Sequence, residues 1–147
     1  RWRCGMDKLL VSACLLGAPC RYDGKSKRVE QVCALAQRYA LIPVCPEQLG
    51  GLPTPRLPSE RRGERVVMAD GSDVTENYRR GAEKALALCL AHGCAAAVLK
   101  EKSPSCGCGR IYDGTFSRRL IDGSGVTAEL LQQNGIRICG ESSLNGF

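Results

Sequence analysis

The sequence predicts a single α/β domain with a doubly wound, mostly parallel, Rossmann-like sheet and long functional loops at the carboxyl ends of its strands. Three observations support this prediction. Short apolar runs alternate with segments whose apolar residues recur every three or four positions, so strands and helices alternate along the chain. The chain has 147 residues, enough for one domain with a real core. Three of the apolar runs are followed closely by a cysteine.

The composition is that of a soluble globular protein, with 44% hydrophobic and 24% charged residues. Its longest apolar runs are too short to cross a bilayer, so we expect no membrane association. The N-terminus shows no charged-then-apolar signal segment, and we therefore expect a cytoplasmic protein. We expect the domain to cover residues 8–140. We interpret residues 1–6, including Cys4, as a remnant of an upstream start or a disordered N-terminus.

The net charge of +6 suits an anionic or nucleobase-containing partner. The basic residues are dispersed, however, and only seven aromatic side chains are present to stack on bases, which argues against stable nucleic-acid binding. We expect a small-molecule partner, and the sequence leaves open whether the protein is a monomer or a dimer.

Ten cysteines are many for a chain of this length. In a small secreted protein they would indicate a disulfide framework. Clear helix and strand patterns favour a reducing cytoplasm instead, with some cysteines on a metal. The remaining cysteines then serve as small buried apolar residues.

In the first part of the chain, we expect a strand at Lys8–Ala13 and a loop at Cys14–Gly24, punctuated by Gly, Pro and Asp-Gly. Lys25–Tyr39 predicts a helix, because four apolar residues recur there at helical spacing. Leu41–Val44 predicts a second strand. Pro43 places this strand at a sheet edge or at its own end.

The segment Cys45–Pro58 is rich in proline and glycine, which predicts a long, irregular and pre-shaped loop. A short strand at Arg65–Met68 and a turn at Asp70-Gly71 follow it. We then expect a long helix that ends near His92. Asp73 would be its N-cap, with Glu76 completing a capping box, and Gly93 would be its C-terminal cap.

The last part of the chain predicts a third strand at Cys94–Leu99, which leads into a polar loop at Lys102–Gly109. Arg110–Phe116 indicates a turn with short extended arms. A final helix opens near Ser124 and ends at Asn134-Gly135, and Ile136–Cys139 predicts the last strand.

Cys14, Cys45 and Cys106 follow the first three predicted strands. Ligands of open α/β sheets bind beyond the carboxyl ends of the strands, so these thiols should converge in one crevice. Converging thiolates repel one another unless a cation holds them. Three cysteines suit an incomplete zinc site or a [4Fe–4S] cluster with one open iron. Soft sulfur ligands without a histidine favour the cluster. The alternative is a zinc site completed by Cys20 or Cys108.

Two other residue types near these cysteines suit catalysis. Glu47, two residues after Cys45, can act as a general acid or base, or it can be a solvated carboxylate paired with Arg56. Ser103 and Ser105 can position a substrate or a water, or they can simply form a turn.

Weaker binding candidates are Tyr22, Asp23 and Arg56. Lys100 and Lys102 can attract an anion, although a role as surface charge is favoured.

Several motifs in order resemble the small iron–sulfur thiouracil desulfidase family, and the match runs from about Leu9 to Ile138. The motifs are Ser12-Ala13-Cys14-Leu15-Leu16-Gly17, Cys20-Arg21-Tyr22-Asp23-Gly24, Cys45-Pro46-Glu47, Gly50-Gly51-Leu52, Pro55-Arg56, Asp70-Gly71, Asp73-Val74-Thr75, Gly81-Ala82-Glu83, Leu99-Lys100, Ser103-Pro104-Ser105-Cys106-Gly107, Ile111-Tyr112-Asp113-Gly114-Thr115-Phe116 and Gly125-Val126-Thr127-Ala128.

The resemblance implies an enzyme of the hydrolase or lyase type with an oxygen-sensitive [4Fe–4S] cluster. Three cysteines would hold the cluster, which by motif are Cys14, Cys45 and Cys106, with Cys20 and Cys108 as alternates. The open iron would bind the sulfur of a thiolated pyrimidine such as 2-thiouracil. Uracil and hydrosulfide would form without net redox change.

The resemblance also implies roles for individual residues. Glu47 would activate water or shuttle its proton, and Ser103 would hydrogen-bond the substrate or relay a proton. We expect Ser105, Arg56 and Tyr22 to bind the substrate. The sequence leaves open whether the substrate is a free base, a nucleoside or RNA.

Two other functions compete with this reading. One is a zinc-stabilised module that binds a nucleobase or RNA. The other is a cysteine hydrolase with Cys106 as the nucleophile. The hydrolase lacks a convincing base, because the only histidine, His92, is expected far from the strand ends.

Overall fold

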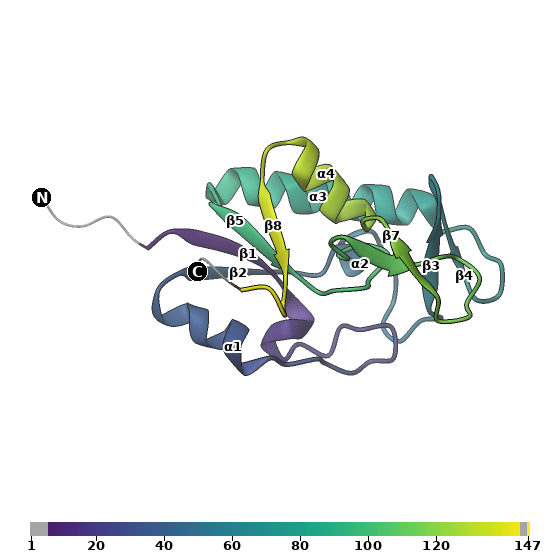
Figure 1. Cartoon of the computed structure of the whole chain (residues 1–147), viewed down its shortest axis with the longest axis horizontal. Helices are drawn as coiled ribbons and strands as arrows, with labels where there is room; N and C mark the ends of the chain where they lie inside the picture. The colour runs from purple at the N-terminus through teal and green to yellow at the C-terminus, as the bar shows by residue number, and fades with distance from the viewer. Residues whose placement is uncertain (1–5, 145–146) are drawn as a thin grey trace, which may run out of the picture.

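Four parallel strands form the central sheet of the protein, in the order β2-β1-β5-β8 (Figure 1). The computed structural model describes residues 6–144 and 147, so Cys4 and most of the predicted N-terminal remnant lie outside the described residues. The sheet consists of β1 (Lys8–Ser12), β2 (Ala40–Val44), β5 (Ala96–Leu99) and β8 (Arg137–Gly140).

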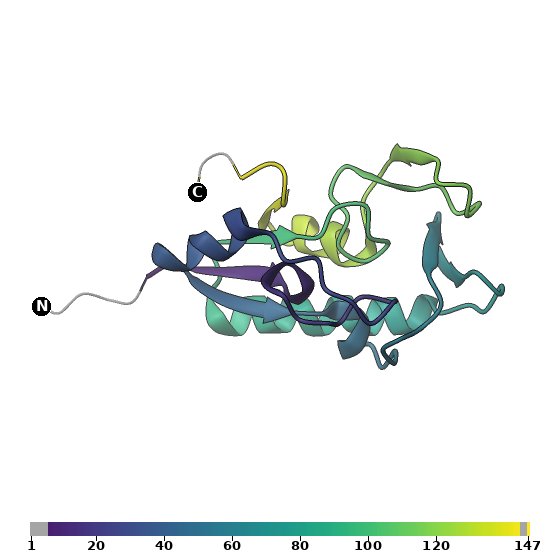
Figure 2. The same cartoon turned by 90° about the horizontal axis from the view of Figure 1, so that it is seen from below.

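Helical segments cover both faces of this sheet, as Figure 2 shows for α1 and α3. Helices α3 (Thr75–His92) and α4 (Val126–Gln133) pack on the face that carries Leu10. Helix α1 (Glu30–Cys33) and the following 3₁₀ turn η2 (Ala34–Gln37) pack on the face that carries Leu9 and Val11. A strand covered on both faces is apolar throughout, and these three residues of β1 are fully buried. The predicted doubly wound parallel sheet is confirmed.

The order of the strands locates the place where a ligand is expected. From β1 the chain crosses to β2 on one side, and later strands are added on the other side as β5 and β8. The topological switch point therefore lies between the carboxyl ends of β1 and β5, at Ser12 and Leu99.

Two small antiparallel hairpins lie beyond the carboxyl ends of the central strands (Figure 1). One pairs β3 (Ser59–Arg62) with β4 (Arg65–Met68), and the other pairs β6 (Arg110–Tyr112) with β7 (Leu120–Asp122). Strand β3 contacts β6, so the hairpins form one wall. The sequence predicted β4 and an extended arm at β6, but it missed β3 and the three-residue β7.

The helix predicted at Lys25–Tyr39 is wrong at its start, because α1 begins only at Glu30. The preceding backbone is engaged elsewhere. The N–H groups of Lys27 and Val29 donate to the carbonyls of Cys14 and Leu15 in the 3₁₀ turn η1 (Ala13–Leu16). These tertiary bonds hold the segment extended and prevent an earlier helical turn.

The predicted loop at Cys45–Pro58 also differs, since it opens with the short helix α2 (Pro46–Leu49). Pro46 occupies the first helical turn, where its missing N–H costs nothing. At α3, the N-cap is Val74 rather than the predicted Asp73. Asp73 still serves the helix start, because its Oδ1 accepts the N–H of Thr75 at 2.9 Å.

Within the described part of the chain, none of the helices combines the length and apolar character that a membrane span requires. The nine cysteines that the structure describes are all free thiols.

Candidate functional site

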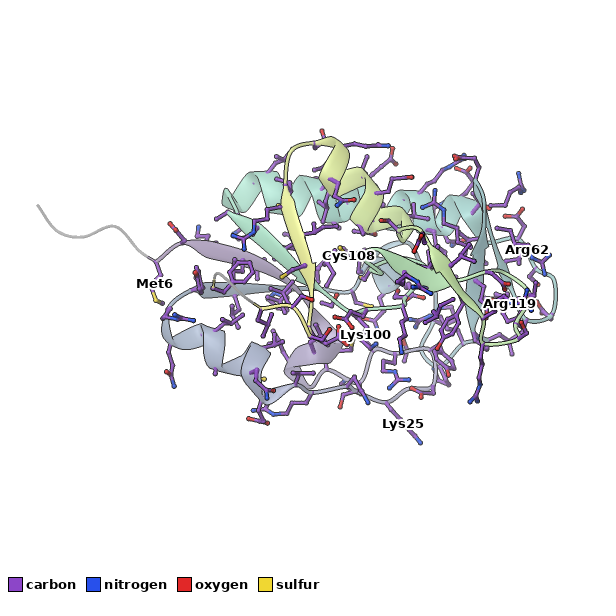
Figure 3. The ribbon with its side chains drawn as sticks, viewed as in Figure 1. Met6, Lys25, Arg62, Lys100, Cys108 and Arg119 are labelled. Atoms are coloured by element: carbon purple, nitrogen blue, oxygen red, sulfur yellow. The ribbon has the colours of Figure 1, made fainter. Side chains whose placement is uncertain are left out.

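A cavity of about 440 Å³ lies where the carboxyl ends of β1, β2 and β5 meet the wall formed by the hairpins. This volume is within the usual range for small-molecule sites. Figure 3 shows Lys100, which lines the cavity, near the middle of the molecule, with Arg62 and Arg119 at the hairpin end. The cavity therefore occupies the place that the strand order indicates.

Four thiols line this cavity: those of Cys14, Cys20, Cys45 and Cys106. The Cys20 thiol is within hydrogen-bonding reach of both Cys14 and Cys45. The structure thus brings the three predicted ligands to one cavity and places the alternate Cys20 beside two of them. The other alternate, Cys108, does not line the cavity.

The electrostatics of these thiols follow from their crowding and burial. The hydrogen bond with Cys20, reinforced by burial, raises the pKa of Cys45 far above its usual range. Burial raises the pKa of Cys106 to about 12. Without a cation these two sulfurs hold their protons, and a bound metal would stabilise their thiolates.

Among the described residues, no three His, Cys, Asp or Glu side chains converge in the arrangement that a single metal ion needs. Thiolates that hold a four-iron cluster each bind a different iron, so they lie around a volume rather than at a point. An all-sulfur donor set around a cavity, with Cys14, Cys45 and Cys106 coming from three separate segments, fits such a cluster.

Glu47, in the first turn of α2, lines the cavity, and both of its carboxylate oxygens have a partner. The hydroxyl of Tyr78 on α3 donates to Oε1 at 2.5 Å, and the guanidinium of Arg56 lies 3.3 Å from Oε2. The Arg56 side chain is only 2% exposed and also donates to the carbonyl of Cys20 at 3.1 Å. These contacts fix Glu47 next to the thiols.

Tyr78 is a functional candidate that the sequence analysis missed. It belongs to the apolar stripe of α3 and is 1% exposed, which is the signature of a core residue. Burial, strengthened by the nearby charge of Glu47, raises its pKa well above its usual value, so the hydroxyl remains a donor. The only hint in the sequence is that a buried tyrosine hydroxyl requires a polar partner.

Ser103 lines the cavity at the start of the loop that carries Cys106. Its Oγ accepts the N–H groups of Ser105 and Cys106, both at 3.0 Å, which leaves its own proton available for donation. The same loop caps α4, because the carbonyls of Pro104 and Ser105 accept the first N–H groups of that helix. The hydroxyl of Ser103 and the thiol of Cys106 are thus held by a fixed backbone.

The remaining predicted residues differ in their access to the cavity. Tyr22 lines it and is 41% exposed. Ser105 is fully buried, and its hydroxyl hydrogen-bonds the hydroxyl of Thr127 at 2.8 Å. Ser105 and Arg56 do not line the cavity, and Asp23 instead pairs with Arg21. Substrate contact by Ser105 and Arg56 stays a prediction.

Lys100 and Lys102 both line the cavity, although the sequence favoured a role for them as surface charges. Lys100 lies 3.4 Å from the carboxylate of Glu141 and donates to the carbonyl of Glu101. Lys102 is exposed.

Comparison with known proteins places this site in context. A family model described as 2-thiouracil desulfurase matches residues 9–143. A solved structure described as the [4Fe–4S]-dependent thiouracil desulfidase TudS is 52% identical, with a TM-score of 0.90, over 94% of this chain and 93% of that one. YbbK of Bacillus subtilis (strain 168), described as an uncharacterized protein, is 46% identical over 93% of this chain and 97% of its own length.

Proposed function

The chain belongs to the 2-thiouracil desulfurase family, and from this premise we propose that it is an iron–sulfur-dependent enzyme that desulfurates thiolated pyrimidines. With 2-thiouracil, water would replace the thiocarbonyl sulfur, giving uracil and hydrosulfide without net redox change. The observation that supports this most strongly is the meeting of Cys14, Cys45, Cys106 and Glu47 in one cavity.

Cys14, Cys45 and Cys106 would hold a [4Fe–4S] cluster, as the three separate strand-end loops bring their sulfurs to the cavity. When bound, such a cluster supplies a Lewis-acidic iron with an open position for the substrate's sulfur. The Cys20 thiol is within hydrogen-bonding reach of two of the three thiols and would be the alternate ligand.

Glu47 would take the proton of the attacking water, since its carboxylate lines the cavity. Arg56 and Tyr78 would hold this carboxylate in position through their contacts with its two oxygens. Ser103 would donate its hydroxyl proton to the substrate, because its oxygen already accepts two backbone N–H groups.

We further propose that Tyr22 contacts the substrate at the exposed side of the cavity. Ser105 would support the reaction indirectly, because its hydrogen bond with Thr127 would keep the Ser103 loop in place. The physiological partner would be a small thiolated base, and the free thiols suit a reducing cytoplasm.

The test is the iron and sulfide content of protein prepared without oxygen, followed by hydrosulfide release from 2-thiouracil. We expect about four iron and four sulfide per chain. Cys106→Ala should prevent cluster assembly, while Glu47→Gln should retain the cluster and lose turnover. Cys33→Ala is the matched control, because Cys33 lies on α1 away from the cavity lining. Zinc without any cluster, or a loaded protein that releases no hydrosulfide, would overturn the proposal.

A further inference from the structure

Glu60 of β3 lies in the hairpin wall of the cavity with one oxygen engaged and one free. Its Oε1 accepts the N–H groups of Gly114 and Phe116, at 2.9 and 3.0 Å. Within residues 6–144 and 147, its Oε2 has no hydrogen-bond or ion-pair partner. Solvent can reach this oxygen, since the buried atoms without a partner in this part of the chain are Arg56 Nε and Ser59 Oγ. Glu60 is only 9% exposed and lines the cavity, and one of its two carboxylate oxygens is without a partner among the described residues.

The loop that follows β6 is fixed to β3 from two sides. Glu60 holds it on the cavity side, and Arg62, two residues along the same strand, donates from Nε to the carbonyl of Gly114 at 2.6 Å. A Cβ on Gly114 would lie 2.3 Å from the Arg62 side chain, so backbone and side chain are in close contact. Arg62 does not line the cavity. The position of the Glu60 carboxylate is thus set by the fold before any ligand arrives.

Backbone strain concentrates around the cavity, at two residues of the same wall and one of the loop after β5. Three non-glycine residues of the described chain have positive φ: Lys102 at 68°, Phe116 at 57° and Arg118 at 62°. All three line the cavity. Such conformations are unfavourable and persist where the surroundings over-determine them, most often at ligand sites. The bond from the Phe116 N–H to Glu60 is one of the contacts that impose this geometry.

Water can solvate this oxygen in the empty cavity, but a ligand that displaces the water must offer a donor in its place, because a buried carboxylate oxygen without a partner is costly. The ring N–H groups beside the thiocarbonyl of a thiolated pyrimidine are such donors, and a hydrogen bond to a charged acceptor is stronger than a neutral one. We propose that Oε2 of Glu60 accepts a ring N–H of the substrate and so selects thioamide heterocycles that carry this proton. The proposal rests on the proposed function, since it names how that substrate is recognised.

Glu60→Gln separates recognition from support of the loop. The amide oxygen can still accept the N–H groups of Gly114 and Phe116, whereas the amide nitrogen then presents a donor to the cavity. Arg62→Met is the matched control, since it removes the other contact to the loop without touching the cavity. The measurements are kcat and KM with 2-thiouracil and with its ring N-methylated analogues, and calorimetric binding of the product uracil, all on loaded protein.

For Glu60→Gln we expect a KM for 2-thiouracil and a Kd for uracil raised about tenfold to a hundredfold, with kcat nearly unchanged. The wild type should discriminate against one of the N-methylated analogues by a similar factor, and Glu60→Gln should not weaken binding of that analogue further. Arg62→Met should leave this discrimination intact.

Wild-type affinity in Glu60→Gln, or equal loss of discrimination in Arg62→Met, would overturn the proposal. These outcomes differ from failure of the proposed function. If the proposed function were wrong, the loaded wild type would release no hydrosulfide. If the loaded wild type bound neither uracil nor 2-thiouracil, both the proposed function and the role of Glu60 would be overturned.

Discussion

Glu47 depends on two residues that do not themselves line the cavity. Arg56 contacts one of its oxygens and Tyr78 the other, so the carboxylate has little freedom to turn. Arg56 also bonds the carbonyl of Cys20, which couples the position of the candidate base to that of the thiol segment. A base within reach of both water and substrate gains from such fixed orientation.

This arrangement predicts that Tyr78→Phe lowers kcat about tenfold, because the lost hydroxyl donates to a charged group. KM and iron content should stay close to those of the wild type, since Tyr78 does not line the cavity. Steady-state kinetics with iron analysis checks this. Tyr39→Phe is the control, as Tyr39 packs in the core on the α1 side of the sheet. Unchanged kcat in Tyr78→Phe would show that Arg56 alone positions Glu47.

At the residue scale, the sequence identified the groups that stand next to a recognisable strand end. Cys14, Cys45 and Glu47 lie within three residues of a strand end, Cys106 lies seven residues after one, and all four line the cavity. It missed Tyr78, whose helical spacing is that of a core residue and whose partner lies 31 positions away. Contacts this distant are fixed by tertiary packing and leave no local pattern.

Glu60 was missed for a different reason. The segment Ser59–Arg62 is polar and carries no apolar alternation, so nothing in it predicts a strand that forms a cavity wall. Its partners Gly114 and Phe116 are more than 50 residues away, and only the pairing of the two hairpins brings them together.

At the level of elements, the position of α2 is set by direct backbone contact with α3. A Cβ on Gly81 of α3 would lie 1.9 Å from the carbonyl oxygen of Pro46, and one on Gly50 would lie 2.0 Å from that of Asn77. Glycine is required here for close approach of two backbones rather than for an unusual φ. Helix α2 carries Glu47 and directly follows Cys45, so this contact places both groups.

Gly81→Ala should therefore destabilise the protein, although alanine is the better helix former by about 1 kcal/mol. The added methyl group forces α2 away, and overpacking of this kind costs about 1–3 kcal/mol. Turnover should fall with stability, because Glu47 moves with the helix. Denaturant unfolding and kinetics check this, with Glu83→Ala on the exposed face of α3 as control. A Gly81→Ala protein more stable than the wild type would contradict the contact.

The start of α3 gives a pH-dependent prediction. Hydrogen bonds from the Thr75 hydroxyl and N–H, together with Arg65, lower the pKa of Asp73 to about 2. Because the folded value is below the unfolded value of 3.8, the stabilisation is present above pH 3.8 and is lost as the pH falls toward 2. Asp73→Asn should thus be less stable than the wild type near neutral pH, and the difference should shrink below pH 3.8 and vanish only once the pH is below about 2.

The free energy of unfolding of both proteins, measured across this pH range, tests the linkage. Glu83→Gln, a change of exposed charge on the same helix, controls for the effect of net charge. A difference between Asp73→Asn and the wild type that stays constant with pH would show that the charge of Asp73 is not responsible.

The sequence predicted which elements exist better than where they begin. The alternation of apolar runs indicated every strand of the central sheet. The start of α1 was wrong because extended residues before it bond to the turn after β1, through hydrogen bonds between residues 13 and 14 positions apart. Helical spacing of apolar residues reports which side chains are buried, and it does not report which backbone groups are already engaged.

On the scale of the whole molecule, the site lies between the buried sheet and loops that are bonded to one another and to helices α3 and α4. Leu9, Leu10 and Val11 of β1 are fully buried between the two layers of helices, independently of the cavity. The loops carry their own cross-connections, such as the N–H of Arg56 bonded to the carbonyl of Tyr22 at 2.7 Å. A bound cluster would join three of these loops through Cys14, Cys45 and Cys106.

Removal of the cluster by a chelator should therefore leave the sheet folded and loosen the loops. The far-ultraviolet circular dichroism should stay that of the loaded protein, while the midpoint of thermal unfolding should fall, because a cluster held by the folded loops would stabilise only the folded state. Hydrogen exchange should accelerate in residues 13–24, 45–58 and 100–109 and remain slow in β1 and β5. Global loss of protection would instead show that the cluster is required for folding of the whole domain. Cys106→Ala should give the same exchange pattern without the chelator, since it would prevent cluster assembly, while the hydrophobic cluster on the α1 side of the sheet does not include Cys106.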